Sequence, residues 1–251
     1  MKKLSTLLLC GLLLLAFACG EDGDASLSNE SSGTGTAGSF ASFVIVGDYL
    51  YAINGSAIHT YELSANGDIS FRSEVGLDAT LETVFPYGEL LLVGSQEGVF
   101  FLDRSNLADP QFLSVYRHIT ACDPVVATGS IAYSTLRSTR CRFGNVDQVD
   151  VIDFSDIENP QVVNTYESVE PLGLGIRGDF LFLCEDSGVT MYNISTPTVL
   201  AEMGKIEFDG AIALDVIPAD QYLVVTTNRG IYNVSFTDVG TMSVMGQVTS
   251  N

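Results

Sequence analysis

The sequence predicts an all-β fold, a five-bladed β-propeller built from four-stranded repeats of about 41 residues, and three observations predict it. A turn signal followed by β-forming residues occurs five times, at spacings of 41, 41, 49 and 42 residues. Runs such as Leu90–Val93 and Phe180–Leu183 do not alternate with polar residues, which indicates strands buried on both faces. No helix longer than one turn is expected between residues 39 and 251. The five signals begin at Gly47, Gly88, Gly129, Gly178 and Asp220.

Each repeat contains four predicted strands. One precedes the turn signal, one follows it, a third begins ten residues after the signal at Gly98, Gly188 and Gly230, and a fourth comes after that. In the third repeat about nine inserted residues delay the third strand to Val149. Such sheets bury both faces when they pack around an axis, so five units fill residues 39–251 as a propeller. An open stack or sandwich is the alternative, and we favour a closed ring because it leaves no apolar end sheet exposed.

The N-terminus has the pattern of an export signal. Lys2 and Lys3 precede an apolar run that ends at Ala18, and this run is shorter than the roughly 20 residues of a membrane-spanning helix. The junction Leu15–Cys19 resembles the lipobox of bacterial lipoproteins. The resemblance implies a signal peptide at 1–18 and acylation of Cys19, which would anchor the protein in membrane lipid. Cleavage by an ordinary signal peptidase, without a lipid, is the alternative.

Residues 19–38 predict a flexible linker between the lipidated Cys19 and the propeller domain. They are Ser, Gly, Thr, Ala and acids with almost no large apolar side chain. The segment Gly20–Asp24 resembles the acidic tether that directs lipoproteins of the Bacteroidetes type to the outer cell surface. We therefore expect an exported outer-membrane lipoprotein that faces the cell surface.

The charge balance excludes one class of partner. After signal cleavage nine basic and 31 acidic residues remain, a net charge of −22. Such a surface repels the phosphate backbone, so we expect no nucleic-acid partner. Solubility at a cell surface is a sufficient reason for the acidity. We expect a monomer.

The segment Val149–Pro160 carries a family resemblance. It resembles the LVIVD repeat, in which a strand ends at an Asp that is followed by a turn containing Pro, and Leu102–Pro110 and Tyr192–Pro197 echo it. Together with Cys122–Val126 and Pro171–Ile176, these residues resemble LVIVD-type surface lipoproteins of Bacteroidetes over about Leu81 to Ile206. The resemblance implies a propeller-like fold and provides no catalytic residue to carry over.

Polar residues that recur with the repeat could bind a metal or could end strands. Asp103 and Asp153, with Asn193 in the same place, fit Asx turns better than metal ligation, because the loop after Asp153 lacks the central glycine of a calcium site. His59 and His118 have no His or Cys at metal-binding spacing. We expect no metal and no other cofactor.

Three cysteines enter the predicted domain. We expect Cys122 and Cys141 to form a disulfide. Cys122 lies in a predicted connection between two sheets, and Cys141 lies in the loop between the second and third strands of the same repeat. Both kinds of segment lie at the same edge of a blade. That bond would close a loop of about 20 residues and stabilise by about 3 kcal/mol. Cys184 lies within an apolar strand and is expected to be a buried small side chain.

The insertion in the third repeat predicts the candidate binding face. It holds three of the nine basic residues of the mature chain, and the expected disulfide would hold it at the mouth of the ring. The arginines could bind an anionic glycan or protein, or could neutralise acids such as Glu97, Glu170 and Asp186. A Cys/His nucleophile near His118 would need an oxyanion loop that the sequence does not show. The candidate residues are Arg117, His118, Asp123, Arg137, Arg140 and Arg142.

The function expected from the sequence is therefore non-enzymatic binding or scaffolding at the cell surface, with an unknown protein or glycan as the partner. The alternative is a propeller-based polysaccharide hydrolase or lyase with paired acids on the same face. Scattered acids and the absence of tryptophan argue against it.

Overall fold

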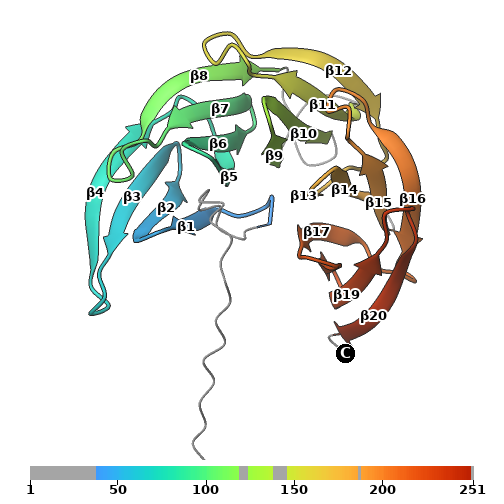
Figure 1. Cartoon of the computed structure of the whole chain (residues 1–251). Helices are drawn as coiled ribbons and strands as arrows, with labels where there is room; N and C mark the ends of the chain where they lie inside the picture. The colour runs from blue at the N-terminus through green and yellow to red at the C-terminus, as the bar shows by residue number, and fades with distance from the viewer. Residues whose placement is uncertain (1–37, 119–123, 138–145, 186–187, 250–251) are drawn as a thin grey trace, which may run out of the picture. The chain divides into compact units, whose positions relative to one another are not determined.

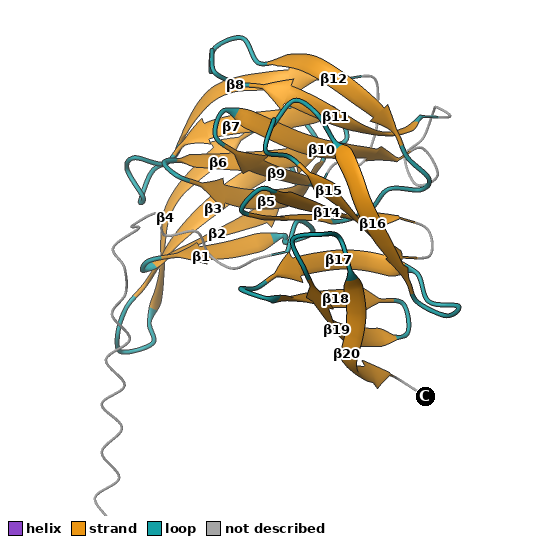
Figure 2. Ribbon diagram, turned by 45° about the vertical axis from the view of Figure 1, so that its right-hand side comes forward, coloured by secondary structure: helices purple, strands orange, loops and turns teal. Residues whose placement is uncertain are grey.

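The computed structural model describes residues 38–118, 124–137, 146–185 and 188–249, all within one compact unit, Ser32–Asn251. Its strands form five four-stranded antiparallel sheets, and the described residues contain no helix (Figure 2). The predicted all-β, five-bladed propeller architecture is confirmed. Within the described part of the chain, no helix has the length and apolar character needed to cross a membrane.

Each sheet uses four strands that are consecutive in the chain. Sheet 1 contains β1 (Phe43–Val46), β2 (Tyr49–Asn54), β3 (Ala57–Leu63) and β4 (Ile69–Gly76). Sheet 2 contains β5 (Leu81–Tyr87), β6 (Leu90–Ser95), β7 (Gly98–Asp103) and β8 (Gln111–Arg117). Sheet 3 contains β9 (Val125–Thr128), β10 (Ile131–Arg137), β11 (Asp147–Asp153) and β12 (Gln161–Glu167). Sheet 4 contains β13 (Leu174–Arg177), β14 (Phe180–Glu185), β15 (Gly188–Asn193) and β16 (Ala201–Glu207). Sheet 5 contains β17 (Ala213–Pro218), β18 (Tyr222–Thr227), β19 (Gly230–Phe236) and β20 (Met242–Thr249).

The sheets pack through alternate residues of their second strands. In β6, Leu91 joins the hydrophobic cluster shared with sheet 1, and Leu92 joins the cluster shared with sheet 3. In β14, Leu181 likewise faces sheet 3 and Phe182 faces sheet 5. The central strands of sheets 2, 3 and 4 are therefore buried on both faces, as their unbroken apolar runs predict.

Two tyrosines at the same repeat position add hydrogen bonds between sheets. The Tyr51 hydroxyl donates to the backbone oxygen of Leu107, in sheet 2, over 2.8 Å. The Tyr133 hydroxyl donates to the backbone oxygen of Pro197, in sheet 4, over 2.7 Å. Burial raises the pKa of Tyr51 to about 12, so the hydroxyl stays a donor at physiological pH.

The first and last sheets differ from the middle three. In β18 every second residue is buried, and in β2 only Tyr51 is buried, so the second strand of each end sheet is less covered than those of the middle three. Inner strands connect each sheet to the next along the arc in Figure 1, but among described residues no comparable strand contact joins β1 to β17. The sequence favours closure of the ring by sheet 5 on sheet 1, and this closure is not observed. Strand composition shows that both faces are apolar, but it does not show whether a neighbouring sheet is present.

The segment before β1 links the two ends of this arc. The Ser39 hydroxyl donates to Asp215 Oδ1 of β17 over 3.0 Å and accepts the backbone N–H of Leu174, in β13, over 2.8 Å. The backbone oxygen of Ala41 accepts the N–H of Val84, in β5, over 2.8 Å. Residues 38–42 therefore connect sheets 1, 2, 4 and 5, and we call this segment the clasp.

Candidate functional site

Three of the six predicted binding residues, Arg117, His118 and Arg137, are among the described residues, and they lie at one edge of the propeller. This edge holds the turns between second and third strands and the connections between sheets, and we call it the connection rim. Arg117 is the last residue of β8, His118 follows it, and Arg137 is the last residue of β10. Other predicted positions lie outside the described residues: Cys19, Cys122, Asp123, Arg140, Cys141 and Arg142. The acylation, the disulfide and the cationic insertion therefore stay predictions.

Arg137 forms an ion pair at this rim. Its Nη2 lies 3.0 Å from Oε2 of Glu170, and its side chain is 12% exposed. Glu170 has a φ of 47°, a left-handed conformation that costs a non-glycine residue about 1 kcal/mol. This pair matches the alternative in which an arginine of the insertion neutralises a neighbouring acid.

Arg117 and His118 lie at the neighbouring blade of the connection rim. The Arg117 guanidinium carbon is 5.7 Å from the centre of the Phe100 ring, a cation–π distance. The backbone N–H of His118 donates to the backbone oxygen of Glu97 over 3.3 Å. The positive charge of Arg117 therefore lies over the Phe100 ring at the connection rim.

A groove of about 510 Å³ lies between the ends of sheets 3 and 4. Three carboxylates and one ammonium line it, so it presents a negative surface to a ligand. Lys205 Nζ lies 4.0 Å from Glu207 Oε1, at the limit of an ion pair. The lining residues are Glu167, Ser168, Val169, Glu185, Thr190, Tyr192, Glu202 and Lys205.

Glu185 is the fixed centre of this groove. Its side chain is nearly buried, its Oε1 accepts the Ser168 hydroxyl over 2.6 Å, and its Oε2 accepts the Thr190 hydroxyl. Burial, and then the charges of Glu185 and Glu202, raise the pKa of Tyr192 above its ordinary value, so its hydroxyl keeps its proton. Two donors thus hold one carboxylate in place, while Glu167 and Glu202 provide further negative charge for a cationic group.

Sequence reasoning did not identify this groove. Its acids come from three different strands, β12, β14 and β16, and no motif in the sequence links them. The one available signal is structural: the ends of successive blades meet at the connection rim, where Glu167 ends β12 and Glu185 ends β14.

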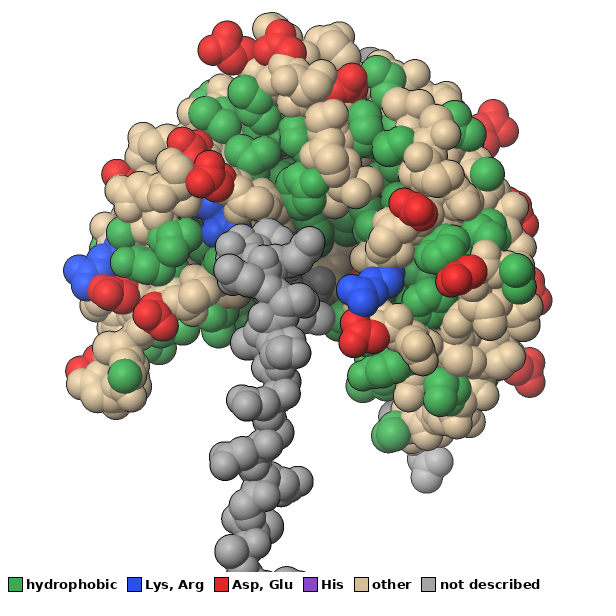
Figure 3. All heavy atoms as spheres, in the orientation of Figure 1, with side chains coloured by type: hydrophobic (Ala, Val, Ile, Leu, Met, Phe, Trp, Pro, Cys, Tyr) green, Lys and Arg blue, Asp and Glu red, His purple; other side chains and the backbone are tan. Residues whose placement is uncertain are grey.

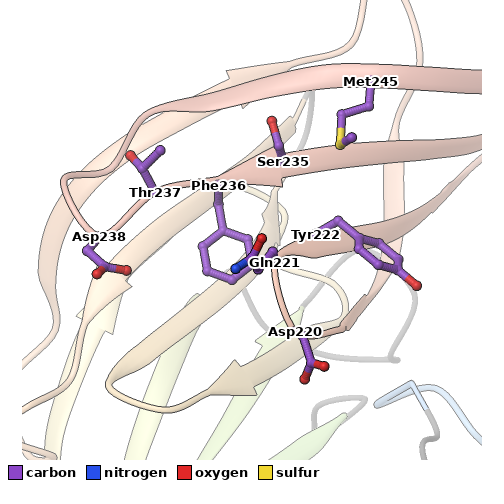
Figure 4. A pocket seen from close by; sticks show the side chains of 8 residues that line it. All are labelled: Asp220, Gln221, Tyr222, Ser235, Phe236, Thr237, Asp238 and Met245. Atoms are coloured by element: carbon purple, nitrogen blue, oxygen red, sulfur yellow. The ribbon is translucent and has the colours of Figure 1, made fainter. Parts of the chain in front are cut away.

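A second hollow, of about 620 Å³, lies at the opposite edge of sheet 5 (Figure 4). Phe236, Tyr222 and Met245 provide apolar surface, and Asp220 and Asp238 stand on two sides of it. Apart from its turn residues, no sequence signal predicts this hollow. It could accept an apolar group that carries a positive charge.

The recurring Asx residues have the predicted structural role. Asp103 Oδ1 accepts the N–H of Ser105 over 2.7 Å, and Asp153 Oδ1 accepts the N–H of Ser155 over 2.8 Å. Asn193 repeats the contact with Ser195 over 2.9 Å. The hydrogen bonds from Ser155 lower the pKa of Asp153. The interpretation as strand-ending Asx turns is confirmed.

Two further features bear on the chemistry available. Within the described residues, no group of three or more His, Cys, Asp or Glu side chains is arranged to hold a metal ion. Cys184 is fully buried, as predicted, and burial raises the pKa of its thiol. In the view of Figure 3 acidic side chains are spread over the surface and basic ones are few.

Comparison with known proteins gives structural neighbours. No protein-family model and no curated protein matches the chain. A protein of unknown function from Desulfotomaculum acetoxidans matches with a TM-score of 0.68 and 10% identity, over 84% of this chain and 70% of that one. A periplasmic gluconolactonase, PpgL, from Pseudomonas aeruginosa matches with a TM-score of 0.62 and 15% identity, over 81% of this chain and 68% of that one.

BamB from Moraxella catarrhalis is a third neighbour, with a TM-score of 0.55 and 14% identity, over 82% of this chain and 63% of that one. At these identities the similarity concerns the fold alone. The gluconolactonase and BamB are β-propeller-type proteins, and the five sheets described here have the same architecture. The chain is a β-propeller protein.

Proposed function

We propose that this protein is a non-enzymatic binding or scaffold protein of the LVIVD type, held at the outer membrane by an acylated Cys19. Its partner, a protein or a glycan, binds at the connection rim of sheets 3 and 4. The observation that carries the proposal is the groove in which Ser168 and Thr190 hold the Glu185 carboxylate in a fixed position. A pre-formed hollow with a few fixed polar groups is the usual form of a recognition site.

The charges of this region support a partner with both signs of charge. Glu167, Glu185 and Glu202 favour a cationic group in the groove, such as a Lys or Arg side chain. The sequence places Arg140 and Arg142 in the adjacent insertion, and Arg117, His118, Asp123 and Arg137 belong to the same predicted face. A protein surface carries both kinds of group more readily than a uniformly anionic glycan does.

A pull-down from intact cells tests the binding role. The full chain is the bait. The variant E167Q/E202Q removes negative charge from the groove, and the variant R137S/R140S/R142S removes positive charge from the insertion. We expect each variant to lose at least tenfold of any specifically captured partner. The matched control, D220N/D238N, neutralises two acids at the hollow of sheet 5 and should capture normally. Equal capture by all variants would reject the rim as the binding site.

The enzymatic alternative has one supporting observation, the three carboxylates in one groove. Hydrolysis or elimination of a polysaccharide needs two carboxyl groups in different protonation states. Assay of surface polysaccharides with the wild-type chain and E185Q distinguishes the two proposals. Activity that E185Q abolishes would replace the binding role with an enzymatic one.

The membrane anchor requires its own test. Cells fed an alkyne-bearing palmitate should label the wild-type chain and not C19S, and protease added to intact cells should remove the domain. Labelling of C19S equal to that of wild type would contradict acylation at Cys19. Protection from protease would contradict surface exposure while leaving the anchor intact.

A further inference from the structure

The last residue of the second strand allows three sheets to be compared. In sheets 2 and 5 this residue is Ser95 or Thr227, and its hydroxyl holds the turn that follows. Each hydroxyl accepts a backbone N–H of that turn, over 3.0 Å in sheet 2 and 3.1 Å in sheet 5. In sheet 4 the same position is Glu185, whose carboxylate accepts two side-chain hydroxyls at the acidic groove instead. The repeat therefore needs a turn-holding hydroxyl at this position, and sheet 4 carries a charge there.

A second buried carboxylate shows how this protein covers a purely structural acid. Asp150 of β11 is 2% exposed and lines neither of the two hollows. Three side chains donate to it: Gln148 over 2.6 Å, Tyr116 over 2.9 Å and Thr165 over 3.0 Å. A carboxylate accepts about four hydrogen bonds. Glu185 has two donors and lies in an open groove, so it keeps acceptor capacity for a ligand.

The negative charge of the groove has no matching positive charge in the part of the chain that the structure describes. There, Glu167, Glu185 and Glu202 form no ion pair, and the lining ammonium, that of Lys205, lies 4.0 Å from Glu207. A buried or half-buried charge without a counter-ion costs free energy. A cation supplied by a partner would remove this cost, so the groove favours a positively charged group.

Tyr192 favours one kind of cation. Its ring lines the groove beside Glu202, its partner on β16, and among the described residues its hydroxyl has no hydrogen-bond partner. Burial raises the pKa of Tyr192, so the hydroxyl remains a donor. A guanidinium is planar and weakly hydrated, and it stacks on an aromatic ring while its N–H groups donate to carboxylates. These properties favour arginine over lysine, and the free hydroxyl suits a backbone carbonyl next to it.

We propose that the groove recognises an arginine side chain on an exposed segment of a partner protein. The guanidinium donates to Glu185 and stacks on Tyr192, while the exposed acids Glu167 and Glu202 attract it. A volume of about 510 Å³ admits one or two side chains and the backbone beside them. This inference rests on the proposed rim function, because it names the partner group that the same groove takes.

Saturation-transfer NMR with the full chain and three short peptides tests the inference. The first peptide is an acetylated glycine–arginine–glycine amide, and the others have lysine or citrulline in place of arginine. Citrulline has nearly the shape of arginine but no charge. We expect the arginine peptide to bind with a Kd of about 1 mM, a value ordinary for so small a ligand. The lysine peptide should bind at least threefold more weakly and the citrulline peptide at least tenfold more weakly.

Charge-removing variants locate the site. E185Q and E202Q should each weaken binding of the arginine peptide at least threefold. Glu202 is exposed, so E202Q leaves the fold intact and a loss in that variant comes from the groove. The matched control D220N/D238N should bind as the wild type does. No saturable binding of the arginine peptide, or equal affinities for arginine and citrulline, would overturn the inference. Tighter binding of the lysine peptide would overturn the choice of a guanidinium.

The pull-down separates failure of this inference from failure of the rim function. If the peptides are not distinguished while E167Q/E202Q still loses the captured partner, the groove binds another group and the arginine assignment is wrong. If all variants capture equally, the rim function is wrong as well.

Discussion

Ser39 and Asp215 are 176 residues apart in the chain, yet the Ser39 hydroxyl donates to Asp215 Oδ1 over 3.0 Å. The same hydroxyl accepts the N–H of Leu174, so one side chain bridges sheets 4 and 5 from a segment that leads into sheet 1. Because sheets 1 and 5 do not pack on each other, the clasp provides the direct connection between the two ends of the arc. Gly38 lies so close to Asp215 that a Cβ atom there would overlap the carboxylate.

The clasp should contribute measurably to stability. S39A removes the donor to Asp215 and leaves the buried N–H of Leu174 without its acceptor, so we expect a loss of about 2 kcal/mol. Urea unfolding followed by circular dichroism measures it. S155A, which alters an exposed turn, should change stability by less than about 0.5 kcal/mol. Equal effects of the two substitutions would show that the clasp carries no stability.

Asp215 should make stability depend on pH. Burial raises the pKa of its carboxyl above the ordinary value of about 3.8, although hydrogen bonds from Ser39, Phe40 and Val216 oppose the shift. The folded state therefore binds a proton more readily than the unfolded state, and the stability from Asp215 falls as pH rises from about 3.8 through the raised pKa. The stability of D215N relative to wild type should increase over this range in urea unfolding at pH 4 to 8. A difference between the two that is constant with pH would contradict this account.

Tyr51 and Tyr133 should contribute similar amounts, because they make the same contact in two repeats. Y51F and Y133F each remove a hydroxyl that donates to a backbone oxygen of the next sheet, so we expect about 1 kcal/mol of destabilisation from each. Thermal unfolding of the single and double variants measures the losses, which should add because the sites are far apart. Y222F, which alters a tyrosine that is 41% exposed, is the control. A stability loss in the double variant that differs strongly from the sum of the two single losses would show that the two contacts are coupled.

Gly98 should be intolerant of any side chain. Its φ is 145°, and a Cβ atom would lie 2.0 Å from the backbone oxygen of Tyr116 in the neighbouring strand. G98A should therefore cost more than about 2 kcal/mol, since β7 and β8 would have to separate. At Gly129, which has a φ of 56° and no atom within 4 Å of a Cβ position, G129N should be nearly neutral. Comparable unfolding midpoints for the two variants would contradict the close approach.

The sequence allowed the repeating parts of the fold to be predicted. Turn glycines such as Gly88, unbroken apolar runs such as Leu90–Val93 and Asx turns at Asp103 and Asp153 are local signals, and they need no knowledge of distant residues. The structure places each of them as expected.

Features that depend on distant partners were not predictable in this way. Ser39 lies at the polar end of a linker, and nothing nearby in the sequence relates it to Asp215. The open faces at Phe43 and Ile231 have the composition of buried faces, so their exposure depends on which sheets surround them. The acidic groove forms because the ends of different blades meet, and its acids Glu167, Glu185 and Glu202 are 18 and 17 residues apart in the sequence.

The central claim is that sheet 1 and sheet 5 each have one uncovered apolar face. In the other sheets, the equivalent face packs against a neighbouring sheet. Maleimide labelling of single-cysteine substitutions under native conditions tests it most directly, with peptide mapping to separate each site from the natural cysteines. F43C and I231C should react at least a hundredfold faster than V84C and V189C, which occupy the same repeat positions in buried faces. Equal protection of all four sites would contradict the claim and would show that the two end sheets are covered.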